Sequence, residues 1–348
     1  MAVSLPKLLP SPRVPEPATA PSIRWGILAP GWIAHQFAAS LRGLTTQRIV
    51  AVGSRSLERA QQFASETGVE TAYGSYAELV GDPRVQAVYV AAPHSEHAAL
   101  ALMAIEAGKH VLVEKPFARN AVEGRRVVRA ARDKRVALME AMWTRFLPRT
   151  DIVRQLLQDG VLGDLQTTVG DHGQSLLDVE RMLRPDLAGG ALLDLGVYPI
   201  SYTHFVLGRP GRIVARAELT NTRGDRQVCV LMGNFADHPH AQALVNTNLA
   251  AKTPTTFTIT GSDARIELDA EFYAPGTVRL VVPGSGVVES VPDVVTSHLG
   301  LAYEAAHFAS LVSDGFTESP THPMDGVLAT LETMDEIRSQ IGVRYPGE

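Results

Sequence analysis

Two segments of the chain place polar residues where they can exchange protons with a substrate. The segment "VLVEKPFA" puts Glu114 and Lys115 directly after an apolar run that predicts a β-strand. The segment "GGALLDLGVYPI" puts Asp194 and Tyr198 four residues apart, which places both on one face of a predicted helix. A lysine can hydrogen-bond a substrate hydroxyl and stabilise its negative charge, and a tyrosine beside a cation is suited to general acid–base catalysis.

Both segments also have an ordinary structural interpretation. Glu114 and Lys115 can form a surface ion pair at a loop, and their spacing alone favours that interpretation. Tyr198 can be a buried tyrosine on an amphipathic helix, which is the commoner case. The two glycines before this helix, Gly189 and Gly190, would let the backbone approach a ligand closely.

The segment "GILAPGWIA", residues 26–34, matches a dinucleotide-binding loop except at its first glycine position, which is Ala29. We expect Gly31 to be the bare position beside the pyrophosphate. The N–H groups of Trp32 and Ile33, at the start of a helix, would bind the anion. Ala29 can make this turn only with a negative φ, because a Cβ disfavours the left-handed conformation. The alternative is a strand, turn and helix without a ligand.

The end of the next predicted strand, in "VGSRSLER", favours NADP over NAD. An NAD site places an acid at this strand end to hold the ribose 2′-hydroxyl. Here the strand end carries Ser54 and Arg55 instead, and Arg59 follows on the next helix. Arginine suits a 2′-phosphate because its guanidinium is always charged and forms paired hydrogen bonds. The alternative is a solvated helix start with surface arginines.

The segment "APHSEH" carries two histidines after a third apolar strand. We place Ala92, Pro93 and His94 near the cofactor, together with His97, which begins the following helix. A zinc site is disfavoured because Cys229 is the only cysteine and no third ligand is evident. We therefore predict no metal.

The elements that must position these residues change character near residue 145. From Ile23 onward, strands and helices alternate and the strands are continuously apolar, which predicts a doubly wound parallel sheet. After residue 145 the strands alternate more loosely and follow short turns, which favours an antiparallel sheet. We predict an α/β protein with a flexible proline-rich arm (1–22), a Rossmann dinucleotide-binding domain (23–145) and a substrate-binding and oligomerisation α/β domain (146–348).

Composition excludes several other classes of protein. The 348 residues are enough for about two domains. The formal net charge of −5 gives no support for binding nucleic acid or an anionic membrane. The chain has no apolar run of 18 residues and its first 22 residues do not read as a secretory signal. A single cysteine fits a cytoplasmic location.

Several segments occur in an order that resembles a known family. They are "GILAPGWIA", "VAVGSRSLERAQQFA", "VYVAAPHSEH", "AGKHVLVEKPFA", "MEAMWTRFLP" and "GGALLDLGVYPI". In this order they resemble the glucose–fructose oxidoreductase/inositol dehydrogenase/rhizopine-catabolism family, over about residues 23–346. Three segments, "EAMWTRF", "LLDLGVYP" and the final "MDEIRSQIGVRYP", are most similar to its dimeric dihydrodiol dehydrogenase and NADP-xylose dehydrogenase branch.

The resemblance implies roles for the candidate residues. Lys115 and Tyr198 would sit around the nicotinamide ring, with Tyr198 as general acid/base and Lys115 polarising the reacting oxygen. Asp194 would help to place the substrate, and Arg55 and Arg59 would contact the 2′-phosphate. The resemblance also implies further pocket residues and an open, predominantly antiparallel C-terminal sheet that supports homodimers. The further pocket residues are Trp143, Arg145 and His172.

These observations predict an oxidoreductase that uses NADP, or alternatively NAD. It would move a hydride between nicotinamide and a carbinol or hemiacetal carbon of a sugar or cyclic diol. Two alternatives stay open: a glycosidase of the same superfamily that keeps its nicotinamide bound without net redox change, and a non-enzymatic NADP-sensing protein. We expect a small-molecule substrate, self-association as a homodimer or higher homo-oligomer, and neither nucleic-acid nor membrane partners.

Overall fold

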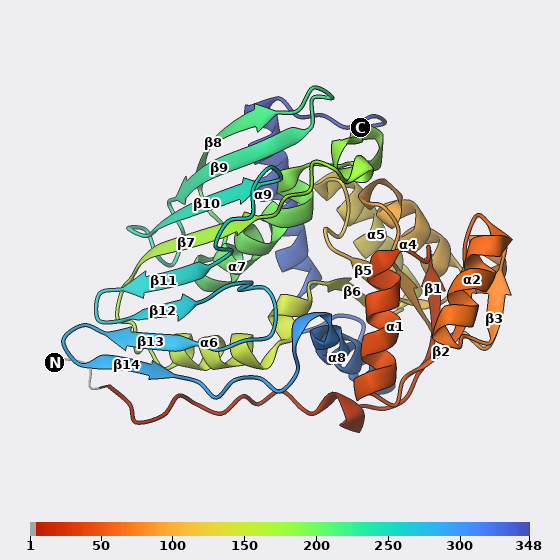
Figure 1. Ribbon diagram of the computed structural model, residues 1–348, viewed down its shortest axis with the longest axis horizontal. Helices are drawn as coiled ribbons and strands as arrows, with labels where there is room; N and C mark the ends of the chain where they lie inside the picture. The colour runs from red at the N-terminus through yellow and green to blue at the C-terminus, as the bar shows by residue number, and fades with distance from the viewer. Residues whose placement is uncertain (1–4) are drawn as a thin grey trace. The chain divides into compact units, whose positions relative to one another are not determined.

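The structure is a computed structural model that describes residues 5–348 (Figure 1). Contacts between Cα atoms divide the chain into two compact units. Unit 2 comprises Val14–Phe146 and Ser297–Leu328, and unit 1 comprises the segment up to Arg13, Leu147–Thr296 and Ala329–Glu348. The sequence analysis assigned all of residues 146–348 to one domain, whereas contacts group residues 297–328 with the N-terminal unit.

Unit 2 contains a parallel sheet of six strands in the order β3-β2-β1-β4-β5-β6. The strands are β1 (Arg24–Leu28), β2 (Arg48–Gly53), β3 (Thr71–Tyr73), β4 (Ala87–Val90), β5 (His110–Glu114) and β6 (Leu138–Ala141). The strand order reverses between β1 and β4, and ligands of such sheets bind outside the carboxyl ends of the strands at this point. The predicted doubly wound sheet is confirmed.

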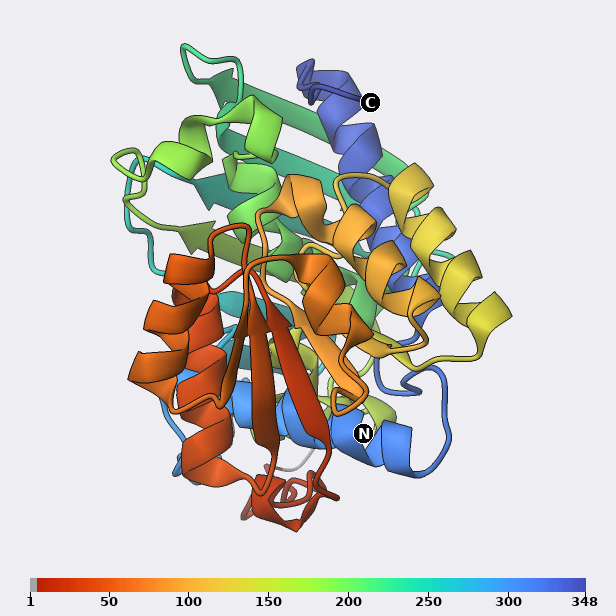
Figure 2. The same ribbon diagram turned by 90° about the vertical axis from the view of Figure 1, so that its right-hand side faces the viewer.

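Helices cover both faces of this sheet (Figure 2). They are α1 (Trp32–Leu44), α2 (Leu57–Thr67), α3 (Tyr76–Gly81), α4 (His97–Glu106), α5 (Ala121–Lys134) and α8 (Leu301–Ser313). Helix α1 packs against α2 and α8, whereas α4 packs against α3 and α5. The ends of α2 follow from its sequence: the Ser56 side chain accepts from the Arg59 N–H, and Gly68 closes the helix in a left-handed conformation.

Unit 1 contains a mixed sheet of eight strands in the order β14-β13-β12-β11-β7-β10-β9-β8. The strands are β7 (Leu165–Gly173), β8 (Arg212–Leu219), β9 (Asp225–Gly233), β10 (Gln242–Asn248), β11 (Phe257–Gly261), β12 (Arg265–Leu268), β13 (Arg279–Val282) and β14 (Gly286–Glu289). Strands β7 and β10 run parallel and the other neighbours run antiparallel. The predicted second sheet, predominantly antiparallel, is confirmed.

Helices cover one face of the unit 1 sheet. They are α6 (Pro148–Gln158), α7 (Val197–Leu207) and α9 (Met324–Ile341), whose first turn belongs to unit 2. Helix α7 packs on β7 and β10, and Gln340 of α9 hydrogen-bonds the backbone of β8. Along β8 every second residue is exposed, which shows that the opposite face of the sheet is open. Nowhere in residues 5–348 is a helix both long and apolar enough to cross a membrane.

The N-terminal segment lies against α6 where unit 1 includes it. The Arg13 main-chain N–H donates to Asp151 Oδ2 at 2.8 Å, and the Arg13 guanidinium donates to Asp151 Oδ1 at 3.0 Å. Gln155 Nε2 donates to the Ser11 carbonyl at 2.9 Å. These contacts hold residues 11–13 on the first turns of α6, while the flexibility of the whole arm stays a prediction.

Candidate active site

The turn after β1 has a conformation that the sequence analysis excluded. Ala29 adopts φ = +67°, in the left-handed region, so the predicted negative φ is wrong. The Ala29 N–H donates to the Gly53 carbonyl at 3.0 Å, and the Gly31 N–H donates to the Ala29 carbonyl at 2.8 Å. These two hydrogen bonds hold the turn in a shape that glycine adopts more readily. Pro30, between them, has no N–H to satisfy.

Protein packing does not require glycine at position 31, because the space beside its Cα holds almost no protein atoms. A Cβ at Gly31 would meet only the Ala91 carbonyl, at 4.0 Å, whereas a Cβ at Gly26 would lie 2.7 Å from Leu79. Gly31 is also the N-cap of α1 and has an extended backbone. Space beside a helix N-terminus, where Trp32 and Ile33 supply the first N–H groups, fits a phosphate. The residues present therefore fit a dinucleotide.

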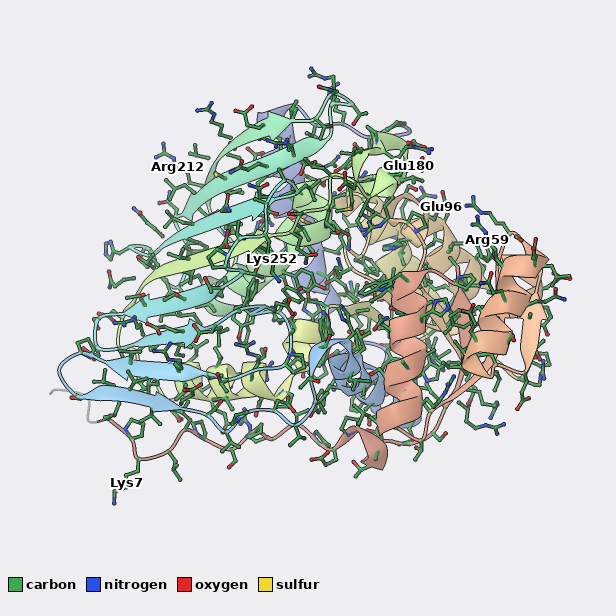
Figure 3. All side chains as sticks on the ribbon, in the orientation of Figure 1. Lys7, Arg59, Glu96, Glu180, Arg212 and Lys252 are labelled. Atoms are coloured by element: carbon green, nitrogen blue, oxygen red, sulfur yellow. The ribbon has the colours of Figure 1, made fainter. Side chains whose placement is uncertain are left out.

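The end of β2 presents cationic side chains to solvent. Arg55 and Arg59 are exposed, and Arg59 extends from α2 (Figure 3). Ser54 is buried and its hydroxyl accepts from the Ser56 N–H at 3.2 Å. Burial raises the pKa of Tyr76, and the neighbouring Arg55 opposes that rise. Arg55 therefore lies beside an aromatic ring at this strand end.

The two histidines after β4 have different environments. The His97 ring has no exposed surface, with Nδ1 2.8 Å from the Pro116 carbonyl and Nε2 2.8 Å from the Ala92 carbonyl. Burial lowers the pKa of His97 to about 3, and the neutral ring donates one of these two hydrogen bonds. His97 therefore joins the segments that follow β4 and β5. His94, which follows Pro93, is buried with its ring 5.7 Å from that of His97.

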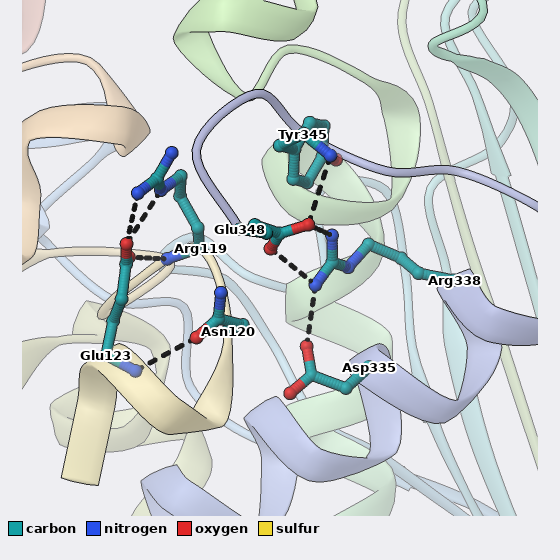
Figure 4. A network of polar contacts seen from close by, with 7 residues as sticks. All are labelled: Arg119, Asn120, Glu123, Asp335, Arg338, Tyr345 and Glu348. Atoms are coloured by element: carbon teal, nitrogen blue, oxygen red, sulfur yellow. Dashed lines mark hydrogen bonds and ion pairs between the residues drawn. The ribbon is translucent and has the colours of Figure 1, made fainter.

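The segment after β5 holds Lys115 beside a buried acid. Glu114 accepts hydrogen bonds from the Tyr89 hydroxyl and from the Lys115 N–H, the latter at 3.1 Å. Burial raises the pKa of Glu114 to about 7, against the effect of the Lys115 charge. Further along, Arg119 forms an ion pair with Glu123 and so ties this segment to the start of α5 (Figure 4).

Two more acids are buried in unit 2. Glu140 Oε2 lies 2.8 Å from His322 Nε2, and Glu140 Oε1 accepts from the Phe117 N–H at 2.9 Å. Glu304 on α8 has no exposed surface, and burial together with Glu114 and Glu140 raises its pKa well above the usual range. Burial therefore favours the protonated form of Glu304.

Trp143 belongs to an aromatic cluster that the sequence did not reveal. Its ring stacks on His298 with centroids 5.4 Å apart, and Trp32 meets the same ring edge-on at 4.8 Å. His298 follows the strands of unit 1 in sequence but belongs to unit 2. The structure thus brings Trp143 and the start of α1 together through a residue more than 150 positions away. Arg145 is buried in the same turn as Trp143.

In unit 1 the structure brings Tyr198 and His172 together. Their ring centroids are 5.4 Å apart, and Tyr273 packs against both, at 4.7 Å from Tyr198 and 4.6 Å from His172. His172 Nδ1 lies 3.1 Å from the Leu195 carbonyl, and Gln174 Nε2 lies 3.0 Å from His172 Nε2. In this arrangement Nδ1 can donate to the Leu195 carbonyl while Nε2 accepts from the Gln174 amide.

Asp194 is buried and paired. Its Oδ1 lies 3.2 Å from the Arg181 guanidinium. The sequence analysis assumed α-helical spacing between Asp194 and Tyr198, but residues Leu192–Gly196 form a π-helical turn that leads into α7. The four-residue spacing therefore does not by itself place the two side chains on one face.

The two glycines before this turn serve protein packing. A Cβ at Gly189 would lie 2.2 Å from the Arg181 carbonyl, and a Cβ at Gly190 would lie 2.3 Å from Asp225 Oδ1. The predicted close approach is therefore made by protein atoms.

Sequence reasoning missed Gln174, Tyr273, Arg181 and His298. Gln174 was within reach, because it lies two residues after His172 and so points to the same side of the chain. Arg181 and His298 lie in short 3₁₀ turns and Tyr273 lies in a loop, and such short segments show no periodicity that would mark them. Across residues 5–348 no cluster of three or more His, Cys, Asp or Glu side chains is suited to a metal.

The comparisons with known proteins agree with this architecture. The sequence profile described as an oxidoreductase family with an NAD-binding Rossmann fold matches residues 23–142, and the GFO/IDH/MocA C-terminal domain matches residues 151–267. The trans-1,2-dihydrobenzene-1,2-diol dehydrogenases of Danio rerio and Homo sapiens are 36% and 34% identical, covering 93% of this chain and 98% of each relative. A 3-ketoreductase from Actinomadura kijaniata, crystallised with NADP and TDP-benzene, is 26% identical with a TM-score of 0.81, covering 92% of this chain and 98% of its own.

A doubly wound parallel sheet in one unit and a mixed, mostly antiparallel sheet in the other are the architecture of a two-domain dinucleotide-dependent enzyme. The profiles together cover more than half of the chain, and the chain belongs to the GFO/IDH/MocA oxidoreductase family. The predicted family is confirmed, as is the predicted use of a nicotinamide cofactor.

Proposed function

We propose that this protein transfers hydride between NADP(H) and a carbinol or hemiacetal carbon of a sugar or cyclic diol. The observation that carries the proposal is near-full-length similarity to dehydrogenases whose named substrate is a cyclic vicinal diol. The A. kijaniata relative with bound NADP supports the cofactor, as do Arg55, which follows β2, and Arg59, on α2.

Each unit supplies part of the proposed chemistry. The bound nicotinamide supplies or accepts the hydride. Tyr198 exchanges the hydroxyl proton of the substrate, and Tyr273 and His172 pack against its ring and fix its orientation. Lys115 hydrogen-bonds the same oxygen and stabilises its negative charge, with Glu114 fixing its main chain. Asp194, held by Arg181, orients a neighbouring hydroxyl of the substrate.

The remaining predicted residues bind the two ligands. Gly31 and the N–H groups of Trp32 and Ile33 hold the pyrophosphate, and Ser54, Arg55 and Arg59 hold the 2′-phosphate. Trp143 and Arg145 contact both cofactor and substrate. Ala29 shapes the phosphate turn, and the segment from Ala92 to His97, including Pro93 and His94, lines the cofactor site through its backbone.

Substitution of the proposed acid and cation tests this function. With NADPH formation followed on trans-1,2-dihydrobenzene-1,2-diol, D-xylose and levoglucosan, Lys115→Ala and Tyr198→Phe should each lower kcat at least about 100-fold. The Kd for NADPH, from fluorescence titration, should stay within about threefold because neither group holds the phosphates. Lys134→Ala, at an exposed pair with Glu106, is the control.

Three results would contradict the proposal. Near-normal turnover by both variants would remove Lys115 and Tyr198 from the chemistry. Cleavage of a glycosidic bond without net change in NADPH would identify the glycosidase alternative, and binding of NADPH without turnover of any substrate would favour the sensor.

We also propose that the protein is a cytoplasmic homodimer that pairs through the open face of the unit 1 sheet. Four exposed apolar residues align across adjacent strands there: Val214 opposite Leu231, Leu231 opposite Leu244, and Leu244 opposite Val169. A continuous apolar row on an exposed sheet is typical of an interaction surface. A second copy would present the same row, as a twofold interface requires.

A further inference from the structure

The segment that carries Asp194 and Tyr198 begins at the Ala191–Leu192 peptide group, whose N–H and carbonyl are both hydrogen-bonded by side chains. The Leu192 N–H donates to Asp225 Oδ2 at 2.5 Å. The carbonyl of the same peptide group, on Ala191, accepts from the Thr247 hydroxyl at 3.1 Å. Asp225 and Thr247 both have no exposed surface. Both polar atoms of this buried peptide group are therefore satisfied by side chains distant in sequence.

The two side chains come from paired strands of one sheet. Asp225 is the first residue of β9 and Thr247 lies near the end of β10, and these strands are antiparallel neighbours. They contact a peptide group 33 and 56 residues away. The position of this peptide group is thus fixed relative to β9 and β10.

Three glycines keep this arrangement compact. Gly190 has φ = +147°, and a Cβ there would lie 2.3 Å from Asp225 Oδ1. A Cβ at Gly196, at the end of the π-helical turn, would lie 3.2 Å from the Thr247 methyl group. Gly189 packs on the Arg181 backbone in the same way. Gly190 and Gly196 therefore let β9 and β10 approach the turn, and Gly189 lets the Arg181 backbone approach it.

The C-terminal segment supports Asp225 from within the same unit. The Arg338 guanidinium pairs with both carboxylate oxygens of Glu348, at 2.8 and 2.9 Å, and with Asp335 at 2.9 Å (Figure 4). Arg338 also lies over the buried ring of Tyr345, 4.7 Å from its centroid. Burial raises the pKa of Asp225 to about 7, and the Leu192 N–H and the Arg338 charge oppose that rise.

We propose that Asp225 and Thr247 are positioning residues that clamp the Ala191–Leu192 peptide group and thereby set the orientation of Asp194 and Tyr198. This inference rests on the proposed function of Tyr198. A π-helical turn holds one residue more than an α-helical turn of the same ladder, and it is the rarer form. A change of this turn to α-helical hydrogen bonding would rotate the residues that precede α7. By holding the Ala191–Leu192 peptide group, Asp225 and Thr247 keep Asp194 and Tyr198 in the orientation that the reaction needs.

Two substitutions at Thr247 distinguish the effect of its hydroxyl from the effect of its side-chain shape. Thr247→Val keeps the methyl group that packs at Gly196 and removes the hydroxyl, whereas Thr247→Ser keeps the hydroxyl. We expect Thr247→Val to lower kcat about 10-fold, since a small misplacement of a catalytic group has large effects on rate. KM and the Kd for NADPH should change by less than about threefold, and Thr247→Ser should restore kcat to within about threefold of wild type.

A matched control and variants at a second residue distinguish the proposed effect from a general loss of stability. Thr203→Val removes an equally buried hydroxyl, which donates to the Pro199 carbonyl within α7, and should leave kcat unchanged. Asp225→Asn keeps an acceptor oxygen for the Leu192 N–H and should retain more activity than Asp225→Ala.

Two measurements decide the proposal. Amide hydrogen exchange of residues 191–198 should accelerate in Thr247→Val and not in Thr203→Val. In a Tyr198→Phe background, Thr247→Val should lower the residual kcat by less than about twofold, because both changes act on one group. Unchanged exchange at 191–198, or a full further loss of kcat in the double variant, would overturn the clamp. A fully active Tyr198→Phe variant would overturn the proposed function instead, while the exchange measurement still decides the clamp.

Discussion

The turn at Ala29 keeps the backbone conformation of the dinucleotide-binding fingerprint without the glycine that the fingerprint specifies. The first glycine of the fingerprint is absent, yet the turn keeps the positive φ that glycine would supply. An alanine in this conformation costs about 1 kcal/mol relative to glycine. The hydrogen bonds to Gly53 and from Gly31 hold the turn against that cost. The pattern identified the loop, but its geometry depends on contacts with β2 that lie 24 residues away.

Arg55 should determine the choice between cofactors. Arg55→Ala is expected to raise the Kd for NADPH at least about 10-fold and to change the Kd for NADH by less than about twofold, because NADH lacks the 2′-phosphate. Fluorescence titration of both cofactors measures the ratio. Arg129→Ala, at an exposed arginine on α5, should leave both values unchanged. Equal losses for the two cofactors would rule out a 2′-phosphate contact.

The sequence predicts those residues of the candidate site that belong to local motifs, and it does not predict those that are placed by contacts with distant segments. Lys115, Asp194 and Tyr198 could be chosen because each stands in a short motif at the end or start of a regular element. Thr247 and Tyr273 could not, because each contacts a segment distant in sequence: Thr247 the Ala191 carbonyl, and Tyr273 the ring of Tyr198. No local pattern encodes such a contact.

At the scale of elements, the periodic segments were predicted well and the irregular ones were not. The alternating pattern predicted the six strands of unit 2 except the three-residue β3, which is too short to show a period. The helix that contains Tyr198 was predicted, but its π-helical start was not. That start depends on Asp225 and Thr247, and therefore on tertiary contacts rather than on local preference.

The apolar row on the open sheet allows a test of self-association. Leu231 is 44% exposed in the single chain, so Leu231→Asp should leave the fold intact. In a twofold interface the change places two buried charges at the contact and should convert the dimer to a monomer. Light scattering after size exclusion measures the mass. Val122→Asp, at an exposed apolar residue of α5, should leave the mass unchanged. A dimer that survives Leu231→Asp would exclude this face.

At the scale of the whole molecule, buried titratable groups make stability depend on pH in two directions. Glu114 and Asp225 have pKa values raised to about 7, and the pKa of Glu304 is raised well above the usual range. Between the unfolded and folded pKa values the folded state holds more protons, so stability falls as pH rises. The pKa of His97 is lowered to about 3, so its contribution falls as pH drops below about 6.5.

Glu304→Gln isolates one of these contributions. A buried carboxyl that stays protonated while its unfolded form ionises costs about 1.4 kcal/mol of stability per pH unit. The thermal midpoint of Glu304→Gln should therefore exceed that of the wild type by more at pH 8 than at pH 5.5. Glu106→Gln, at an exposed acid paired with Lys134, should show no such widening. A constant difference across this interval would mean that Glu304 is ionised in the folded protein.

The path of the chain through unit 2 has a consequence for its synthesis. Helix α8 supplies Phe308, which packs on Trp25 with ring centroids 5.4 Å apart, and the Leu138 N–H donates to the Thr317 carbonyl at 2.9 Å. Both partners in β1 and β6 leave the ribosome before the 297–328 segment is translated. The parts of β1 and β6 that this segment contacts therefore stay uncovered until almost the entire polypeptide has been made. The apolar surface of β1 that Phe308 later covers is exposed on the nascent chain for that interval, and transiently exposed surface of this kind is prone to aggregation.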